Sequence, residues 1–343
     1  MKLIYREQNS KIFLGNNFKQ DISALFKISG LKQKTGIFII GYQGFVRTEY
    51  YNELKGIIKD YKITVAKQVK IKPNPNQTYI DKLSKARLKI DFILAIGGGS
   101  AIDVGKLAKH YLYKSANLIA IYTLPGSATI VTPFAVFDNE EFKIGIGADN
   151  LIPNYTYINQ QIIKKVSLDR KLIAIADIFS HAIESLYSEA GTELSRKRAR
   201  VALRKLVTQQ VKKISARSLI AAGIEAGLSE RVGMVLFPHA AGHYLTYRFK
   251  IPHSIATMYF LIPYLNLLKD KGININKRYL WYSNYLGSLL KKRGLMPKIK
   301  LSLKDIASLF SLTQKYMSFA YENAPTKIGE NEYKIIVNHY VEN

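Results

Sequence analysis

The amino-acid sequence predicts an α/β protein in which a mostly parallel sheet, with helices on both faces, precedes an all-α bundle. Up to about residue 160, apolar runs of strand length alternate with helical patterns, as is typical of such sheets. Beyond that point the apolar spacing is helical almost throughout. The 343 residues, 48% of them hydrophobic, can bury two cores. We therefore expect one domain over residues 1–162 and a second over 163–343, with the active site in the cleft between them.

The strands expected in the first domain are short apolar runs. Residues 36–40, 92–96 and 118–122 have the length and apolar content of buried strands. Helical patterns cover residues 49–61 and 76–88. This alternation indicates strand–helix–strand units, which build parallel sheets.

The strand expected at residues 92–96 ends in a glycine-rich turn, Gly97, Gly98, Gly99 and Ser100, before a helical pattern begins. Glycines at such a turn let the backbone approach a diphosphate, and the helix N-terminus offers free N–H groups to it. The run does not follow the G-x-G-x-x-G fingerprint, so a tight turn without a ligand is the alternative.

Helices are expected over most of the second domain. Their spans are 170–187, 192–214, 219–228, 254–268 and 303–321. The second span contains a basic run, residues 196–200, and an apolar stripe from Ala199 to Val207. This pattern predicts a helix that packs on the core and has a basic outer face.

Four of the six histidines form, with one aspartate, a pattern typical of a metal site. Asp177 and His181 are four residues apart, as are His239 and His243, so each pair can share a helix face. His239 and His253 each follow a proline, a residue suited to the start of a helix. Imidazole and carboxylate together suit Fe(II) or Zn(II) rather than Ca(II) or Mg(II). For each histidine taken alone, a packed core position is the alternative.

The composition of the chain excludes several classes of protein. The chain has no cysteine, which excludes disulfides and thiolate-bound metals. Its first residues lack the apolar run of a signal peptide, and no stretch approaches the roughly 20 apolar residues that span a bilayer. We expect a cytoplasmic protein without a membrane partner.

The charge balance is strongly basic, because 51 Lys and Arg against 25 Asp and Glu give a net charge of +26. Such a field raises the hypothesis of nucleic-acid or membrane binding. The densest clusters, residues 196–200 and 291–293, come with no nucleic-acid motif. We therefore expect no nucleic-acid partner, and a field that attracts an anionic substrate and the phosphates of a bound nucleotide.

Several motifs occur in the order found in one enzyme family. They are residues 11–15 (KIFLG), 73–75 (PNP), 97–106 (GGGSAIDVGK), 132–136 (TPFAV), 177–185 (DIFSHAIES), 238–239 (PH) and 251–253 (IPH). Over most of its length the chain thus resembles the iron-containing (group III) alcohol dehydrogenases, relatives of glycerol dehydrogenase and dehydroquinate synthase.

The resemblance implies a metal-containing, NAD(P)(H)-dependent alcohol dehydrogenase that works as an aldehyde reductase. Its first domain would bind the dinucleotide, and its second would bind metal and substrate. The metal ligands would be Asp177, His181, His239 and His253, with Fe(II) preferred and Zn(II) the alternative. The substrate would be a small aldehyde or alcohol, including one that carries a phosphate or phosphonate. Whether the protein forms a homodimer stays open.

Two side chains near these ligands have open roles. His243, one turn after His239, is expected to relay a proton, with a packing role as the alternative. Glu184, three residues after His181, either orients a ligand imidazole or lies exposed on its helix.

Cofactor contacts are expected from the glycine turn and from positions that match the family's motifs. They are Tyr42, Arg47, Asn74, Gly97, Gly98, Gly99, Ser100, Asp103, Lys106, Thr123, Ser127, Thr129, Phe134 and Lys143. Tyr42 stands where an aspartate that binds the adenosine ribose is expected, and after the strand at residues 36–40 no acid occurs until Glu49. Because Arg47 can pair with a 2′-phosphate, we expect NADP(H) in preference to NAD(H). If Tyr42 only covers the adenine, both cofactors would be accepted.

The chain also departs from the family. Residues 123–132 read TLPGSATIVT where the family usually has TTxGTGSEVT, and Ser254 replaces the glycine that usually follows the last histidine. Two other classes stay open: a lyase or cyclase of the dehydroquinate synthase type that recycles bound NAD, and a basic binding protein that keeps the fold without catalysis. The first would use a different metal set from Asp-His-His-His.

Overall fold

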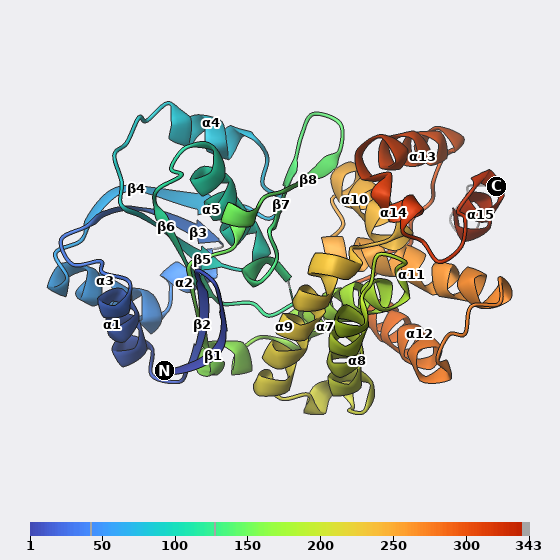
Figure 1. The fold of residues 1–343 in the computed structure, drawn as a ribbon, viewed down its shortest axis with the longest axis horizontal. Coiled ribbons are helices and arrows are strands. Elements are labelled where there is room, and N and C mark those ends of the chain that lie inside the picture. The colour runs from blue at the N-terminus through green and yellow to red at the C-terminus, as the bar shows by residue number, and fades with distance from the viewer. Residues whose placement is uncertain (42, 127, 338–343) are drawn as a thin grey trace. The chain divides into compact units, whose positions relative to one another are not determined.

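The computed structural model describes residues 1–41, 43–126 and 128–337. The chain divides into two compact units, the first formed by Met1–Asn139 with Gly145–Val166 and the second by Glu140–Ile144 with Ser167–Asn343. The first unit contains a mostly parallel sheet and the second is helical (Figure 1). The predicted α/β fold class is thus confirmed.

The sheet of the first unit has seven strands in the order β1-β2-β9-β6-β5-β3-β4. Their bounds are β1 Lys2–Glu7, β2 Ser10–Gly15, β3 Thr35–Gly41, β4 Thr64–Ile71, β5 Phe92–Gly97, β6 Asn117–Tyr122 and β9 Tyr155–Asn159. Strand β1 pairs antiparallel with β2, and the other neighbouring strands are parallel. The three runs expected as strands correspond to β3, β5 and β6.

Helices cover both faces of the central strands. They are α1 Phe18–Ile28, α2 Gln43–Val46, α3 Glu49–Asp60, α4 Thr78–Ser84, α5 Gly99–Tyr111 and α6 Gln160–Lys164. Side chains of one parity, such as Leu94 and Ile119, join a core with α1 and α3. Those of the other parity meet α5, where a Cβ on Gly105 would lie 3.0 Å from Leu118 and 3.1 Å from Ala95. Both faces are buried, which explains why these strands read as continuous apolar runs.

The strand order reverses at β3. From β3 the chain crosses to β4 at the sheet edge, and then returns to β5 on the other side of β3. The carboxyl ends of β3 and β5 therefore lie side by side, and a Cβ on Gly97 would stand 3.2 Å from the Cα of Gly41. In open α/β sheets such a switch point is where ligands bind.

A hairpin and short 3₁₀ helices connect β6 to β9. The hairpin pairs β7 Phe134–Asp138 with β8 Lys143–Gly147, and the 3₁₀ helices are Ala128–Ile130 and Asp149–Leu151. Residues 140–144, at the tip of the hairpin, belong to the second unit.

The second unit is built from helices. They are α7 Leu168–Tyr187, α8 Glu193–Val207, a 3₁₀ turn Val211–Lys213, α9 Ala216–Gly233, α10 Phe237–Phe249, α11 His253–Asp270, α12 Lys277–Lys292, α13 Leu303–Met317, α14 Phe319–Glu322 and α15 Glu330–Val337. The helix expected over 192–214 ends at Val207, and the one expected over 303–321 divides at Ser318. Helix α12 lies outside the expected spans.

Local sequence explains where several helices begin. Ser167, Thr192, Ser215 and Asn276 accept a hydrogen bond from a backbone N–H in the first turn of α7, α8, α9 and α12. Ser302 and Asp305 form a reciprocal capping box at α13.

The basic run on α8 is largely engaged within the protein. Arg196 donates to the carbonyl of Ser188 at 2.9 Å, Arg198 pairs with Glu225 at 3.1 Å, and Arg200 pairs with Glu193 at 3.0 Å. Ala199 and Leu203, on the opposite face, are fully buried. The expected core-packed helix with a basic outer face is present.

Among the described residues, no helix combines the length and the apolar character needed to cross a membrane.

Candidate metal centre

Three helices carry the aspartate and histidines singled out by their spacing. Helix α7 bears Asp177 and His181 one turn apart, α10 bears His239 and His243, and α11 begins at His253. Pro238 occupies the first turn of α10 and Pro252 caps α11, so both prolines stand at helix starts, as expected.

Close packing of α10 on α11 brings their histidines together. A Cβ on Gly242 would lie 2.7 Å from Thr257 Oγ1 and 2.9 Å from Thr257 N. Only glycine allows this approach without a shift of one helix. As a result, the ring centroid of His253 lies 5.1 Å from that of His239 and 4.8 Å from that of His243.

Asp177, His239 and His253 form a group able to hold a metal ion, because one ligand atom of each lies within 4.8 Å of the others. His181 is outside this group but borders it. Its Nε2 is 3.9 Å from Asp177 Oδ2, and its ring centroid is 4.3 Å from that of His239. The four expected ligands, carried by α7, α10 and α11, thus lie next to one another, and three of them are within ligand spacing.

Glu184 fixes the orientation of His239. Its carboxyl accepts the backbone N–H groups of Leu236 at 2.7 Å and His239 at 3.3 Å, and its other oxygen lies 2.5 Å from His239 Nδ1. Glu184 is fully buried, so of its two expected positions the structure has the one beside an imidazole. With Nδ1 held by the carboxyl, Nε2 is the atom of His239 that remains for a metal.

Unpartnered nitrogen atoms test whether a metal fits. His239 Nε2 and His253 Nδ1 are buried and have no hydrogen-bond partner among the described residues. Buried polar atoms without a partner are costly in a native protein and call for an unseen one. Two nitrogens and a carboxylate within ligand spacing supply the mixed donor set that Fe(II) or Zn(II) accepts, so the residues fit a divalent transition metal.

Burial keeps two of the imidazoles neutral. It lowers the pKa of His239 well below its usual range, with the charge on His181 adding to the effect. It also lowers the pKa of His253, reinforced by His243 and His239. A neutral imidazole is the form that binds a metal.

His181 has an additional carboxylate partner, because its Nδ1 lies 3.1 Å from Glu230 Oε2 on α9. Burial alone would lower the pKa of His181, but Glu230 and Asp177 outweigh burial and raise this pKa to about 9. Burial raises the pKa of Glu184 to about 8, against the hydrogen bond from Leu236. A divalent cation would reverse both preferences, since it favours carboxylates and neutral imidazole.

His243 is held differently from the other histidines. Its Nδ1 donates to the carbonyl of Lys143 at 2.7 Å, and burial, with the charge of Lys143, lowers the pKa of His243 to about 3. It is absent from the group of ligand atoms within 4.8 Å of one another. The neutral ring therefore keeps Nε2 as an acceptor beside His253.

The glycine turn of the first unit has the geometry of a strand-to-helix turn. Gly97 has φ +150°, Gly98 caps α5, and α5 begins at Gly99, with Ser100 in its first turn. No acidic residue occurs in that turn, so the free N–H groups and the positive end of the helix dipole are not neutralised by one.

Asp103 and Lys106 engage the segments around the 3₁₀ helix Ala128–Ile130. Thr129 Oγ1 donates to Asp103 Oδ1 at 2.6 Å. Lys106, fully buried, donates from Nζ to the carbonyls of Thr132 at 2.9 Å and Phe134 at 2.5 Å. These contacts hold the 129–134 segment beside the start of α5.

The remaining expected cofactor residues are dispersed. The N–H of Thr123 donates to the Gly97 carbonyl at 3.0 Å, Asn74 is half-buried with φ +54°, and Arg47 is exposed after α2. Lys143 lies in the second unit, where its carbonyl holds His243. Tyr42 and Ser127 lie outside the described residues.

Sequence reasoning missed two groups of the metal centre. Glu230 and the Lys143 carbonyl contact His181 and His243 from segments distant in the chain. An acid buried in an apolar helix was the available signal for Glu230, whereas a backbone carbonyl leaves none.

The chain is similar to known alcohol dehydrogenases both in sequence and in fold. Residues 9–160 match the family model for iron-containing alcohol dehydrogenase. The NADH-dependent butanol dehydrogenase A of Clostridium acetobutylicum is 26% identical over 199 aligned positions, and the match covers 52% of this chain and 50% of that enzyme's length. The NADPH-dependent butanol dehydrogenase of Clostridium saccharobutylicum is 23% identical over 278 aligned positions, and the match covers 72% of this chain and 71% of that enzyme.

Solved structures extend the likeness to the whole fold. An iron-containing alcohol dehydrogenase from Thermotoga maritima superposes with a TM-score of 0.80 at 20% identity, and covers 96% of this chain and 97% of that one.

Proposed function

We propose that this chain, whose residues 9–160 match the family model for iron-containing alcohol dehydrogenase, is a metal-dependent, NAD(P)(H)-linked alcohol dehydrogenase that reduces small aldehydes. The observation that carries the proposal is the group Asp177, His239 and His253, whose ligand atoms lie within 4.8 Å of one another. Among the described residues, His239 Nε2 and His253 Nδ1 in this group are buried without a hydrogen-bond partner. The glycine turn at the switch point of the sheet supplies the second requirement, a place for a cofactor diphosphate.

The metal would be held by Asp177, His181, His239 and His253, and Fe(II) is the ion proposed first, with Zn(II) as the alternative. When bound, it supplies a Lewis acid that stabilises negative charge on the oxygen of the substrate. Glu184 keeps His239 in the tautomer whose Nε2 is available.

We assign His243 to the transfer of the proton that accompanies hydride transfer. Its Nδ1 proton is committed to the Lys143 carbonyl, so the proton can be accepted and passed on only at Nε2. Burial lowers the pKa of His243 to about 3, so the ring is neutral and its Nε2 is an acceptor for that proton.

The first unit would bind the cofactor through its glycine turn. Backbone N–H groups at the start of α5 would bind the diphosphate, while Asp103 and Lys106 hold the loop that follows β6. NADPH is the proposed reductant, because Arg47 is exposed after β3 and no acid lies between β3 and Glu49 to repel a 2′-phosphate. One named relative uses NADH and another NADPH, so this preference rests on this chain's own residues.

The proposed substrate is a small aldehyde, including one with a phosphate or phosphonate group. The net charge of +26 supports the anionic members, because a positive field raises the encounter rate of an anion. The two alternatives raised by the sequence have less support. The buried imidazole atoms that have no partner in the described part of the chain would be costly in a binding protein that had lost its metal, and the donor set is not the one expected of a lyase or cyclase.

The test is anaerobic purification, metal analysis, and a panel of aldehydes assayed with NADPH and with NADH after loading with Fe(II) or Zn(II). Aldehyde-dependent oxidation of the nicotinamide by the metal-loaded protein, and its loss after chelation, are expected. A fully loaded protein that binds NADPH but reduces none of the aldehydes would contradict the proposal.

A further inference from the structure

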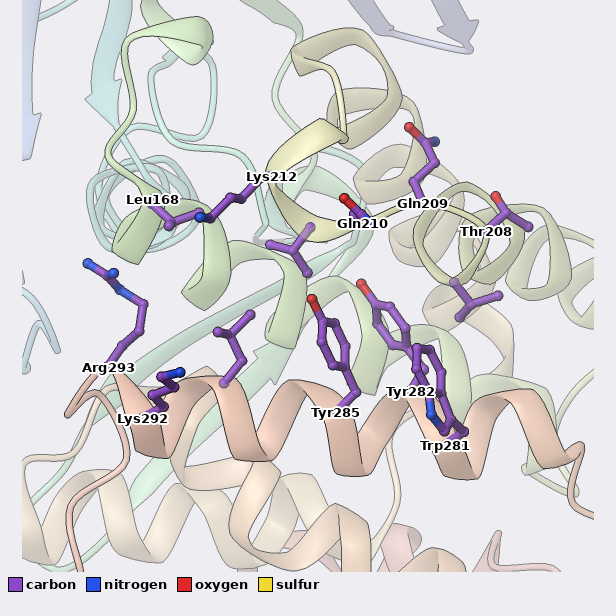
Figure 2. Close-up of a pocket in the computed structure, with 13 residues that line it drawn as sticks. Leu168, Thr208, Gln209, Gln210, Lys212, Trp281, Tyr282, Tyr285, Lys292 and Arg293 are labelled. Atoms are coloured by element: carbon purple, nitrogen blue, oxygen red, sulfur yellow. The ribbon is translucent and has the colours of Figure 1, made fainter.

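The helical unit contains a cavity that the proposed dehydrogenase chemistry does not use. Its volume is about 680 Å³, within the range of sites for small molecules. One wall is a face of α12, and the other is the chain that follows α8, with the start of α7 at one end (Figure 2). Thirteen residues line it, and none is a candidate metal ligand or cofactor residue. They are Leu168, Val207, Thr208, Gln209, Gln210, Val211, Lys212, Trp281, Tyr282, Tyr285, Leu289, Lys292 and Arg293.

The wall formed by α12 offers a flat aromatic surface. Trp281 and Tyr285, one turn apart, have ring planes only 2° from parallel and centroids 5.3 Å apart. Trp281 is 62% exposed, which is unusual for the largest apolar side chain. Aromatic surfaces of this kind stack planar rings of a ligand.

The opposite end of the cavity is basic. Lys212, Lys292 and Arg293 gather there in Figure 2, and the described lining residues include no acid. Asp169 lies just outside the lining and pairs with Arg293 through Nε. The two lysines are exposed. They remain as cations for a phosphate, and the planar guanidinium of Arg293 offers further donors.

The distance between the two ends limits what fits. Trp281 and Lys292 are eleven positions apart on α12, which corresponds to about 16 Å along the helix at roughly 1.5 Å per residue. A planar base followed by a sugar and a chain of phosphates spans that length, whereas inorganic phosphate does not. A polar group for the edge of a base, the amide of Gln210, lies between the two ends in Figure 2.

A buried hydroxyl gives a second observation that points to a ligand. Tyr282 is 1% exposed, its ring lines the cavity, and its hydroxyl has no hydrogen-bond partner among the described residues. In Figure 2 the rings of Tyr282 and Tyr285 both rise from α12 toward the segment that carries Gln210. Buried hydroxyls normally have a hydrogen-bond partner. A polar ligand in the cavity would supply the partner that the Tyr282 hydroxyl lacks among the described residues.

We propose that this cavity binds a free nucleotide, with the base stacked on the Trp281–Tyr285 surface and the phosphates at Lys212, Lys292 and Arg293. The chain's net charge of +26 raises the local concentration of such an anion. The site is independent of the proposed dehydrogenase function, since it shares no residue with the metal centre or the glycine turn.

Trp281 provides the measurement, because it is the one tryptophan in the sequence. ATP is titrated into the purified full-length protein while tryptophan fluorescence is followed, with excitation beyond the absorbance of adenine. Saturable quenching is expected. If millimolar ATP leaves the fluorescence unchanged, the proposal is wrong.

A pair of double variants separates the cavity from the general field. Lys212→Glu with Lys292→Glu should weaken ATP binding at least about tenfold, since two charge-assisted contacts become repulsive. Lys213→Glu with Lys291→Glu is the matched control. It changes the net charge equally at exposed neighbours that do not line the cavity, and should leave the affinity nearly unchanged. Equal losses in both would overturn the site. Both variants should retain their melting temperature and aldehyde reduction.

The aromatic contact has its own test. Tyr285→Leu keeps an apolar side chain but removes the ring, and should weaken ATP binding about tenfold. Sodium triphosphate, which lacks the base, should bind at least about tenfold more weakly than ATP for the same reason. Equal affinity for triphosphate and ATP would show that no base is recognised. If a short single-stranded oligonucleotide binds more tightly than ATP at the same salt concentration, the ligand of the cavity is a nucleic-acid strand and not a free nucleotide.

Discussion

At the scale of single residues, the imidazoles of the metal centre differ in what holds their Nδ1 atoms. A carboxyl holds His239 and a backbone carbonyl holds His243, while His253 Nδ1 has no partner among the described residues. A carboxyl makes a ligand nitrogen more basic, whereas a neutral carbonyl only fixes the tautomer. Because the Nδ1 contacts differ, we expect substitutions of the three histidines to have different effects.

His253→Ala should leave a folded protein with little metal and no turnover. The loss of a direct ligand should lower metal affinity by more than the roughly 10- to 100-fold that loss of an outer hydrogen-bonding partner costs. Metal content after dialysis and the circular dichroism spectrum provide the measurement. His110→Ala is the control, because His110 pairs with Asn150 in the first unit. Full metal occupancy in His253→Ala would remove His253 from the ligand set.

His243→Ala should keep the metal and slow aldehyde reduction by about 100-fold, the lower range for loss of a proton-transfer group. The expected split follows from its Nδ1 contact with Lys143 and its place outside the ligand group. Metal analysis and steady-state rates on the same preparation measure both effects. Metal loss equal to that of His253→Ala would instead make His243 a ligand.

Arg47→Ala should lower the ratio of kcat/KM for NADPH to that for NADH by about tenfold, because a guanidinium that pairs with the 2′-phosphate is lost. Lys59→Ala, at an exposed position of α3, is a control with the same change of charge. Both are assayed at one ionic strength. A clear preference of the unmodified enzyme for NADH would contradict the proposed cofactor.

At the scale of elements, the close approach of α10 to α11 shapes the metal centre. Gly242→Ala would place a Cβ 2.7 Å from Thr257 Oγ1, so α10 and α11 must separate. Overpacking of this kind costs about 1–3 kcal/mol, and the same movement should reduce metal affinity. Gly56→Ala on α3 is the matched control, since its Cβ would meet nothing within 4 Å and alanine favours a helix by up to about 1 kcal/mol. Chemical denaturation measures the two opposite changes, and a Gly242→Ala protein of unchanged stability and metal content would show that the helices are free to shift.

The elements also show what the sequence could and could not predict. Strands β3, β5 and β6 were predicted because burial on both faces leaves an uninterrupted apolar run. Strand β4 was missed because it is a sheet edge, where only Ile71 is buried and the sequence has no continuous apolar run. Helix α12 was missed because the face that carries Trp281 is exposed, which blurs the apolar period.

The same limit applies to the candidate site. Spacing along one helix predicted the pairs on α7 and α10, because residues four apart must share a face. The contact of Glu230 with His181 depends on how α9 packs against α7, and that packing follows from apolar contacts spread over both helices rather than from a local motif.

At the scale of the whole molecule, the excess of basic side chains acts through a general positive field and not through one basic surface. The arginines at 196, 198 and 200 are paired within the protein, while the chain as a whole keeps +26. If this field attracts an anionic substrate, kcat/KM for a phosphorylated aldehyde should fall several-fold between low salt and about 0.15 M, where the Debye length is about 8 Å. An uncharged aldehyde of similar size should show little change. Equal salt dependence for the two substrates would remove the field from substrate capture.

The return of residues 140–144 to the helical unit has a consequence for synthesis on the ribosome. Lys143 is made 100 residues before His243, the side chain that its carbonyl holds. At about 5–20 residues per second, His243 is translated roughly 5–20 s after Lys143. A gene fragment that starts at Ser167 would therefore encode every candidate metal ligand, yet yield a helical unit that lacks one of its own segments.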